Sequence, residues 1–193
     1  MESKHRILSQ IRAGLPPPWP LPEVPVFRLE NPDKPGEMAR ILERGATQVA
    51  RAATISDVNA VIDCYYPQRG KTLSTFPDSS DSALPSPGSP SDCEGTDLAV
   101  LEAVLGVAEN GAIWISEREL QGLRILPFIT QHLVLVVREK TIVGTMHEAY
   151  AKLGRPEAGF GVFIGGPSKT ADIEQSLVIG AQAARSLLVI IIP

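Results

Sequence analysis

The chain has 193 residues, of which 44% are hydrophobic and 21% are charged. This length is typical of one domain, and this composition can bury a core without metal ions or disulfides. A net charge of −4 offers no basic stripe for nucleic acid or an anionic membrane. The most apolar segment, Leu187–Ile192, is too short to cross a bilayer, and the N-terminus has no signal-peptide pattern. We therefore expect a soluble cytoplasmic protein with no nucleic-acid partner and no membrane insertion.

The two cysteines, Cys64 and Cys93, are far apart and form no Cys-x-x-Cys motif. This spacing encodes neither a zinc site nor an iron–sulfur site, and the histidines lack ligand spacing as well. We predict no metal, no bound cofactor and reduced thiols.

The first third of the chain predicts an arm on a tether. Residues 3–13 place Ile7, Leu8 and Ile11 at helical spacing. Eight prolines follow between Leu15 and Pro35, and proline favours an extended chain. The predicted division is an N-terminal helical arm over residues 1–14, a proline-rich linker over 15–35 and an α/β domain over 36–193.

Within that domain the first elements are helical. Apolar residues from Gly36 to Ala53 mark one helix face, and Thr54 or Ser56 can cap a second helix. Lys71–Phe76 predicts a short strand, and the Ser- and Pro-rich residues 77–96 predict a long loop.

The second half alternates apolar strands with amphipathic segments. Apolar runs flank Asn110-Gly111, which predicts a hairpin with a type I′ turn. The predicted strands are His132–Arg138, Phe160–Ile164 and Leu187–Ile192, and the predicted helices are Met146–Leu153 and residues 170–184. This alternation predicts a three-layer α/β/α fold with a mainly parallel sheet.

One string after the strand at 160–164 is specific. Gly166-Pro167-Ser168-Lys169-Thr170-Ala171-Asp172-Ile173-Glu174 resembles the C-terminal signature of the LUD family, in its lactate-utilisation C branch. Ala108–Ala112, Leu126-Pro127 with His132, and residues 2–13 are similar to other family segments in the same order. The chain departs from the family at Gly180–Ala184, where Gly-x-His-Gly-Pro is usual, so any contact made by that histidine is missing here.

The resemblance implies a fold like that of glucosamine-phosphate isomerases, ribose-phosphate isomerases and CoA transferases. It also implies a non-redox role in the oxidation of L-lactate to pyruvate beside iron–sulfur subunits. A shared fold does not assign chemistry by itself.

The strand–glycine–helix corner predicts a site for a small anion, a carboxylate or a phosphate. Gly165 and Gly166 let backbone approach a ligand, while Ser168, Lys169 and Thr170 supply donors at a predicted helix start. The alternative is simple helix capping, with Asp172 complementing the helix dipole and repelling an anion.

Glu109-Asn110-Gly111 is similar to the Glu-x-Gly element of CoA transferases, whose glutamate is the catalytic nucleophile. The alternative is an ordinary turn with a solvated acid. His132, at a strand start, and Asp172 are further candidates to line a site, although a structural hydrogen bond also explains His132.

The sequence is compatible with three functions. The first is the non-redox subunit of a lactate-utilisation system that binds an anionic ligand. The second is an independent enzyme of the CoA-transferase or sugar-phosphate-isomerase type that uses Glu109. The third is a regulatory module that senses an anion through residues 165–170.

Overall fold

A computed structural model describes residues 2–16, 19–20, 22–76, 82–83, 89–154, 159–170 and 178–193. Its helices are α1 (Glu2–Ala13), α2 (Lys34–Arg44), α3 (Asp57–Tyr65), α4 (Leu126–Ile129) and α5 (Met146–Leu153), with short 3₁₀ helices η1 (Pro90–Cys93) and η2 (Glu139–Thr141). Its strands are β1 (Gln48–Arg51), β2 (Thr72–Ser74), β3 (Ser82–Ala83), β4 (Leu98–Glu102), β5 (Leu105–Val107), β6 (Ile113–Ser116), β7 (His132–Arg138), β8 (Ile142–Val143), β9 (Gly161–Ile164), β10 (Lys169–Thr170), β11 (Val178–Ile179) and β12 (Ser186–Ile192).

A parallel sheet in the order β1-β12-β7-β4-β2-β3 forms the centre of the molecule. Its middle strands β7 and β12 are nearly all apolar because side chains on both of their faces are buried. The predicted α/β class with a mainly parallel sheet is confirmed.

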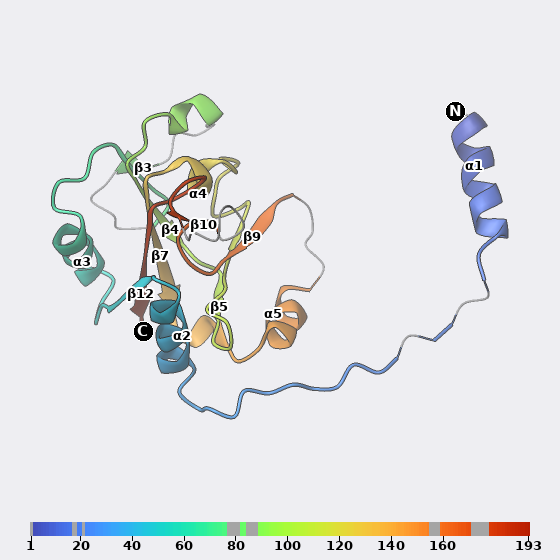
Figure 1. The fold of residues 1–193 in the computed structure, drawn as a ribbon, viewed down its shortest axis with the longest axis horizontal. Helices are drawn as coiled ribbons and strands as arrows, with labels where there is room; N and C mark the ends of the chain where they lie inside the picture. The colour runs from blue at the N-terminus through green and yellow to red at the C-terminus, as the bar shows by residue number, and fades with distance from the viewer. Residues whose placement is uncertain are drawn as a thin grey trace.

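Different elements cover the two faces of this sheet (Figure 1). Val58 and Ile62 of α3 pack on one face. Met38 and Leu42 of α2 pack on the other, together with a second sheet in the order β8-β5-β6-β9. This second sheet was not predicted. It forms because the apolar run that precedes Asn110 divides into β4, which joins the parallel sheet, and β5, which pairs with β6.

The helix predicted from Gly36 to Ala53 is wrong beyond Arg44. Asp33 caps α2 by accepting a hydrogen bond from Gly36 N at 2.9 Å. At the other end Gly45 N donates to the carbonyls of Ile41 and Leu42, and Ala46 has φ of 62°. The chain therefore reverses, and β1 pairs in parallel with β12.

The turn at 108–111 is not the predicted type I′ turn. Gly111 has φ of 71°, but Asn110 is not in the positive-φ region. Gly111 N donates to Val107 O at 2.9 Å, and Asn110 Oδ1 accepts from Ala112 N at 3.0 Å. A longer turn that needs one left-handed glycine therefore joins β5 to β6.

The helix predicted over residues 170–184 is also wrong in its described parts. Lys169 pairs with Ile179, and Thr170 pairs with Val178, in a two-stranded antiparallel ladder. Thr170, Val178 and Ile179 are β-branched, which favours strands over helices. Residues 180–183 form bends, and residues 171–177 lie outside the described part of the chain.

The helix predicted over residues 3–13 is confirmed as α1, which Figure 1 shows well apart from the rest of the chain. Leu29, on the segment that leads back toward α2, packs against the core. The division into arm, linker and domain stays a prediction.

Candidate functional site

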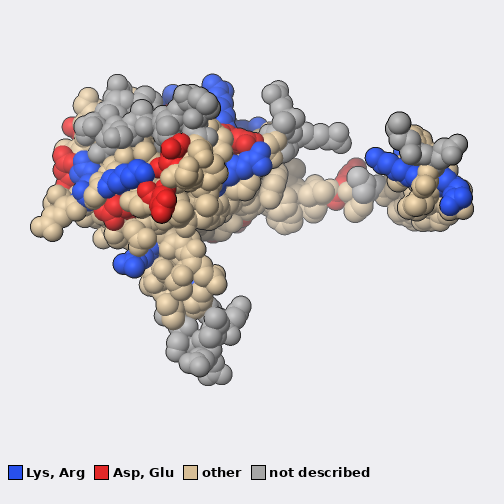
Figure 2. Space-filling view, turned by 90° about the horizontal axis from the view of Figure 1, so that it is seen from above, with Lys and Arg blue, Asp and Glu red and all other residues tan. Residues whose placement is uncertain are grey.

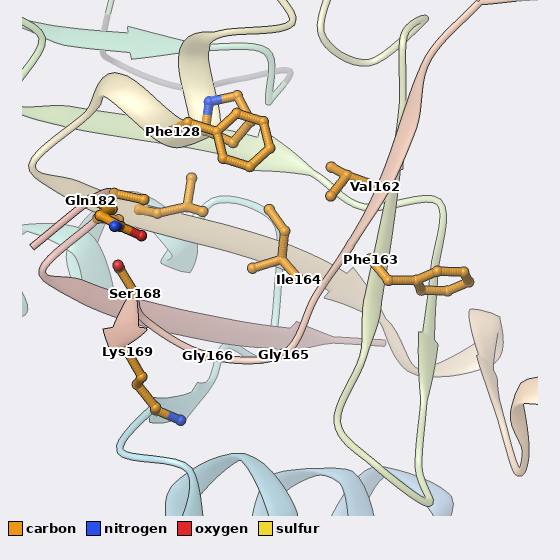
Figure 3. Close-up of a pocket in the computed structure, with 13 residues that line it drawn as sticks. Phe128, Val162, Phe163, Ile164, Gly165, Gly166, Ser168, Lys169 and Gln182 are labelled. Atoms are coloured by element: carbon orange, nitrogen blue, oxygen red, sulfur yellow. The ribbon is translucent and has the colours of Figure 1, made fainter. Parts of the chain in front are cut away.

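A cleft of about 430 Å³ lies where the chain leaves β9 and enters β10 (Figure 3). Its polar side chains are Ser168, Lys169 and Gln182. Its apolar lining comes from α4, β7, β9 and the approach to β12: Pro127, Phe128, Leu133, Val162, Phe163, Ile164, Ala183 and Ala184. Four of the five predicted anion-site residues, Gly165, Gly166, Ser168 and Lys169, line this cleft.

The two candidate segments of the sequence lie beside one another. A β-carbon placed on Gly165 would be 3.9 Å from the carbonyl oxygens of Asn110 and Gly111. The pairing of β9 with β6, with Ile164 opposite Ile113, causes this approach. The turn that carries Glu109 therefore packs against the glycine corner, although Glu109 itself is not among the residues that line the cleft.

Backbone hydrogen bonds hold Ser168 against the segment before β12. Ser168 N donates to Ala184 O at 2.9 Å, and Gly180 N donates to Ser168 O at 2.9 Å. In Figure 3 the Ser168 hydroxyl points toward Gln182, and the Lys169 side chain leaves in the other direction. Neighbouring side chains of an extended segment alternate in this way.

The Lys169 ammonium lies over the C-terminal end of α2. A β-carbon on Gly166 would be 2.9 Å from Lys169 Nζ, and one on Gly45 would be 3.3 Å from it. The last carbonyls of a helix carry partial negative charge and attract a cation. Part of the lysine charge is therefore offset by α2, so an anion in the cleft would meet a weakened field.

The helix start that motivated the anion site is absent from the described residues around Ser168. Thr170 belongs to β10 and is not among the residues that line the cleft; its hydroxyl donates to Val178 O at 3.4 Å. Asp172 lies outside the described residues. The donors available to a ligand are then the Ser168 hydroxyl and the Gln182 amide, with Lys169 at the edge.

Gln182 is a cleft residue that the sequence analysis did not predict. By the resemblance drawn from the sequence, Gln182 stands where Gly-x-His-Gly-Pro would have its histidine, and Gln182, Ala183 and Ala184 all line the cleft. The departure from the family pattern was the signal that could have pointed to it. Phe128, on α4, gave no signal because only the fold brings it to the cleft.

Glu109 has a different set of contacts from the one expected of a nucleophile. Its Oε1 accepts a hydrogen bond from Met146 N at 2.6 Å, and its own amide donates to Gly144 O at 3.0 Å. Met146 is the first residue of α5, whose N-cap is Thr145. The carboxylate therefore binds an otherwise unpaired amide at a helix N-terminus.

His132 lies outside the cleft, at the amino end of the parallel strands. Its Nδ1 is 2.8 Å from Ser186 Oγ, which is also 2.8 Å from the hydroxyl of Tyr66. Burial raises the pKa of Tyr66, and the hydrogen bond with Ser186 opposes that rise. His132 is bonded to Ser186 and packs against Tyr66, and it does not line the cleft although the next residue, Leu133, does. These contacts do not support its predicted place in the ligand site.

Among the residues that the structure describes, no group of three or more His, Cys, Asp or Glu side chains could hold a metal ion. Cys64 and Cys93 are free thiols, and burial raises the pKa of Cys93. No helix in the described ranges is long and apolar enough to span a membrane.

The fold and the cleft define an α/β protein in which a parallel sheet packs on a smaller mixed sheet, with a glycine corner at their junction. Residues 91–192, more than half of the chain, match the model of the LUD domain, and the protein belongs to this family. A crystal structure of a DUF162 family protein from Deinococcus radiodurans superimposes with a TM-score of 0.63 and 17% identity, covering 88% of this chain and 100% of that one, which supports the fold alone.

Two curated relatives confirm the resemblance to the lactate-utilisation C branch. Lactate utilization protein C from Bacillus pumilus (strain SAFR-032) is 36% identical over 80 residues, which are 38% of this chain and 33% of that protein. Lactate utilization protein C from Deinococcus radiodurans is 32% identical over 112 residues, 55% of this chain and 51% of that protein. The matches thus span between one third and about half of these relatives.

Proposed function

We propose that this protein serves lactate utilisation as a non-redox component that binds a small anionic ligand in the cleft at the β9–β10 junction. The names of its relatives from Bacillus pumilus and Deinococcus radiodurans support the metabolic role. The resemblance of the chain to its family supports a place beside iron–sulfur subunits, which would carry the electrons.

The observation that carries the binding proposal is the composition of the cleft. Ser168 and Gln182 place a hydroxyl and an amide on one side, opposite the apolar side chains of Phe128 and Ile164. A few polar groups in an apolar pocket are typical of small-molecule sites. The polar groups would donate to a carboxylate or a phosphate, and the apolar wall would take the carbon chain.

The size of the cleft supports more than one ligand class. A volume of about 430 Å³ falls within the roughly 300–1,000 Å³ of sites for drug-sized ligands. Lactate or pyruvate would fill only part of it. A larger carboxylate or a phosphate ester would contact both the Ser168 side and the Phe128 side.

A thermal-shift screen tests the binding proposal. The panel contains lactate, pyruvate, phosphate, CoA esters, nucleotides and sugar phosphates. A ligand at one hundred times its dissociation constant stabilises the folded state by about 2.7 kcal/mol. We expect one anion class to raise the melting temperature, and we expect Ser168→Ala and Lys169→Ala to reduce that shift. A shift that both variants retain in full would place the ligand elsewhere.

The metabolic role has a separate test. Deletion of the gene should slow growth on L-lactate as sole carbon source, and the tagged protein should co-purify with cysteine-rich iron–sulfur subunits. Normal growth on lactate together with saturable anion binding would favour the regulatory alternative. The transferase alternative depends on Glu109, whose carboxylate already binds the N-terminus of α5.

A further inference from the structure

Helix α1 presents an apolar face that no described residue covers. Ile7, Leu8 and Ile11 lie on one side of the helix and are 52%, 39% and 55% exposed. A helix of 12 residues is marginally stable alone in water, and most helices in proteins are stabilised by packing of such a face. The exposed apolar face of α1 is therefore suited to pack against another protein surface.

The body of the protein has a groove suited to such a helix. Its volume is about 400 Å³, and Trp114, Tyr150, Leu153 and Phe160 form its apolar lining. The Phe163 ring packs against two of these aromatic side chains and holds them in place. Its centroid is 4.6 Å from that of Trp114 and 5.8 Å from that of Tyr150. An amphipathic helix binds a groove of this kind through residues spaced by three or four positions, as Ile7 and Ile11 are.

The length of the tether argues against docking within one chain. Phe27 is fixed at the start of α5, where its carbonyl accepts from Thr145 Oγ1 at 3.4 Å and its ring lies 4.6 Å from His147. The groove lies at the other end of α5, about 12 Å away at ~1.5 Å per residue. Residues 14–26 contain six prolines, and in the extended polyproline form they span about 40 Å. A stiff spacer of that length overshoots the groove of its own chain.

Charge indicates that α1 binds the domain of a second copy and not the α1 helix of that copy. Residues 1–13 hold Lys4, Arg6 and Arg12 against one acid, Glu2, so the arm carries +2 and the rest of the chain carries −6 of the total −4. Figure 2 shows basic side chains on α1. Two arms would repel one another, whereas an arm and an acidic body attract. In the groove itself Glu117 is paired with Arg124 at 2.6 Å, and Arg118 lies next to Glu119, so the attraction comes from the net negative charge of the rest of the chain.

From these observations we infer that the protein forms an arm-exchanged dimer, in which the apolar face of α1 from each copy occupies the Trp114–Tyr150–Phe160 groove of the other. Each dimer then contains two equivalent arm–groove contacts, as two-fold symmetry requires. This inference does not depend on the proposed lactate role.

Sedimentation equilibrium of the full chain over a range of concentrations tests the dimer. Ile11→Glu should raise its dissociation constant at least tenfold, while Ser9→Glu, on the opposite face of α1, should leave it unchanged. On the groove side, Tyr150→Glu should weaken the dimer and the exposed neighbour Ala151→Glu should not. Circular dichroism confirms that each variant is folded.

Mixing Ile11→Glu with Tyr150→Glu gives the decisive result. The first variant keeps an intact groove and the second an intact arm, so a heterodimer with one arm–groove contact should form from two weakly associating samples. In a Trp19→Phe background Trp114 is the only tryptophan, because the chain has two, and its emission should change with dimerisation. A monomer at every concentration would overturn the inference. A change in Trp114 emission that is independent of concentration and is lost in Ile11→Glu would also overturn it, because it indicates docking within one chain. A monomer that co-sediments with phosphatidylglycerol vesicles would overturn it as well.

Discussion

The imidazole Nδ1 of His132 lies 2.8 Å from the hydroxyl Oγ of Ser186, the residue beside it in the parallel sheet. The Tyr66 hydroxyl is 2.8 Å from the same oxygen. A serine hydroxyl has one proton, so it donates to one neighbour and accepts from the other. This arrangement joins the starts of β7 and β12 to the segment after α3.

Removal of the central hydroxyl should therefore affect stability rather than binding. We expect Ser186→Ala to lower the free energy of unfolding by about 1 kcal/mol, the usual contribution of an intramolecular hydrogen bond. Urea unfolding followed by circular dichroism measures this change. Ser168→Ala is the matched control, since it should reduce ligand binding with little loss of stability. If Ser186→Ala abolished ligand binding instead, the cluster would belong to the functional site.

The sequence predicts the elements whose signals are local. A continuous apolar run predicts β7 and β12, and the amphipathic pattern of Met146–Leu153 predicts α5. Local sequence patterns do not predict which strands pair when their residues are far apart in the chain. The residues of β1 continue the helical spacing of α2, and only the reversal at Gly45 and Ala46 places them beside β12.

The cleft residues likewise fall into those that a local motif predicts and those that only the fold brings together. Gly165 to Lys169 are consecutive, so one motif predicted four residues of the cleft. Phe128 and Gln182 come from other segments, and they reach the cleft only because α4 precedes β7 and the 180–184 segment precedes β12. A short motif predicts its own chain segment and not the opposite wall.

Glu109→Ala distinguishes the structural role of this carboxylate from nucleophilic catalysis. Loss of the hydrogen bond to Met146 N at the start of α5 should lower the free energy of unfolding by about 0.5–1 kcal/mol. Ligand-induced thermal shifts should persist. Borohydride trapping with CoA esters should give no adduct at this residue in the native protein. A trapped thioester that is absent from Glu109→Ala would instead establish the transferase alternative.

Glu148 should make stability depend on pH. Its Oε2 accepts from Gly144 N at 2.9 Å and lies 3.5 Å from Lys34 Nζ, and these interactions, the amide first, lower the pKa of the carboxyl in the folded state. A carboxyl with a lowered folded pKa stabilises the protein above its unfolded pKa, about 4.3, and this stabilisation disappears as pH falls through the folded value.

Glu148→Gln should therefore be less stable than the native protein at pH 7, and the difference in the free energy of unfolding should shrink as the pH falls below the unfolded pKa and disappear below the lowered folded pKa. Urea unfolding at several pH values between 7 and 3 measures the difference. Glu43→Gln, which removes one exposed acid from α2, accounts for the general effect of net charge. A difference that grows on acidification would contradict the assigned direction.

Gln182 tests whether the altered family string tunes the cleft. Gln182 lines the cleft near Ser168 and is neutral at every pH, whereas a histidine there would gain a positive charge below about pH 6.5. We expect Gln182→His to bind the anion with the largest thermal shift about tenfold more tightly at pH 5.5 than at pH 8. A hydrogen bond with a charged partner contributes about 1.5–3 kcal/mol against about 1 kcal/mol for a neutral one, and a difference of about 1.4 kcal/mol is a factor of ten. Isothermal titration calorimetry at both pH values measures the ratio against the native protein. Gln10→His, on α1, adds the same titrating group far from the cleft and should give the native ratio. Equal ratios for Gln182→His and Gln10→His would show that the ligand does not contact the 180–184 segment.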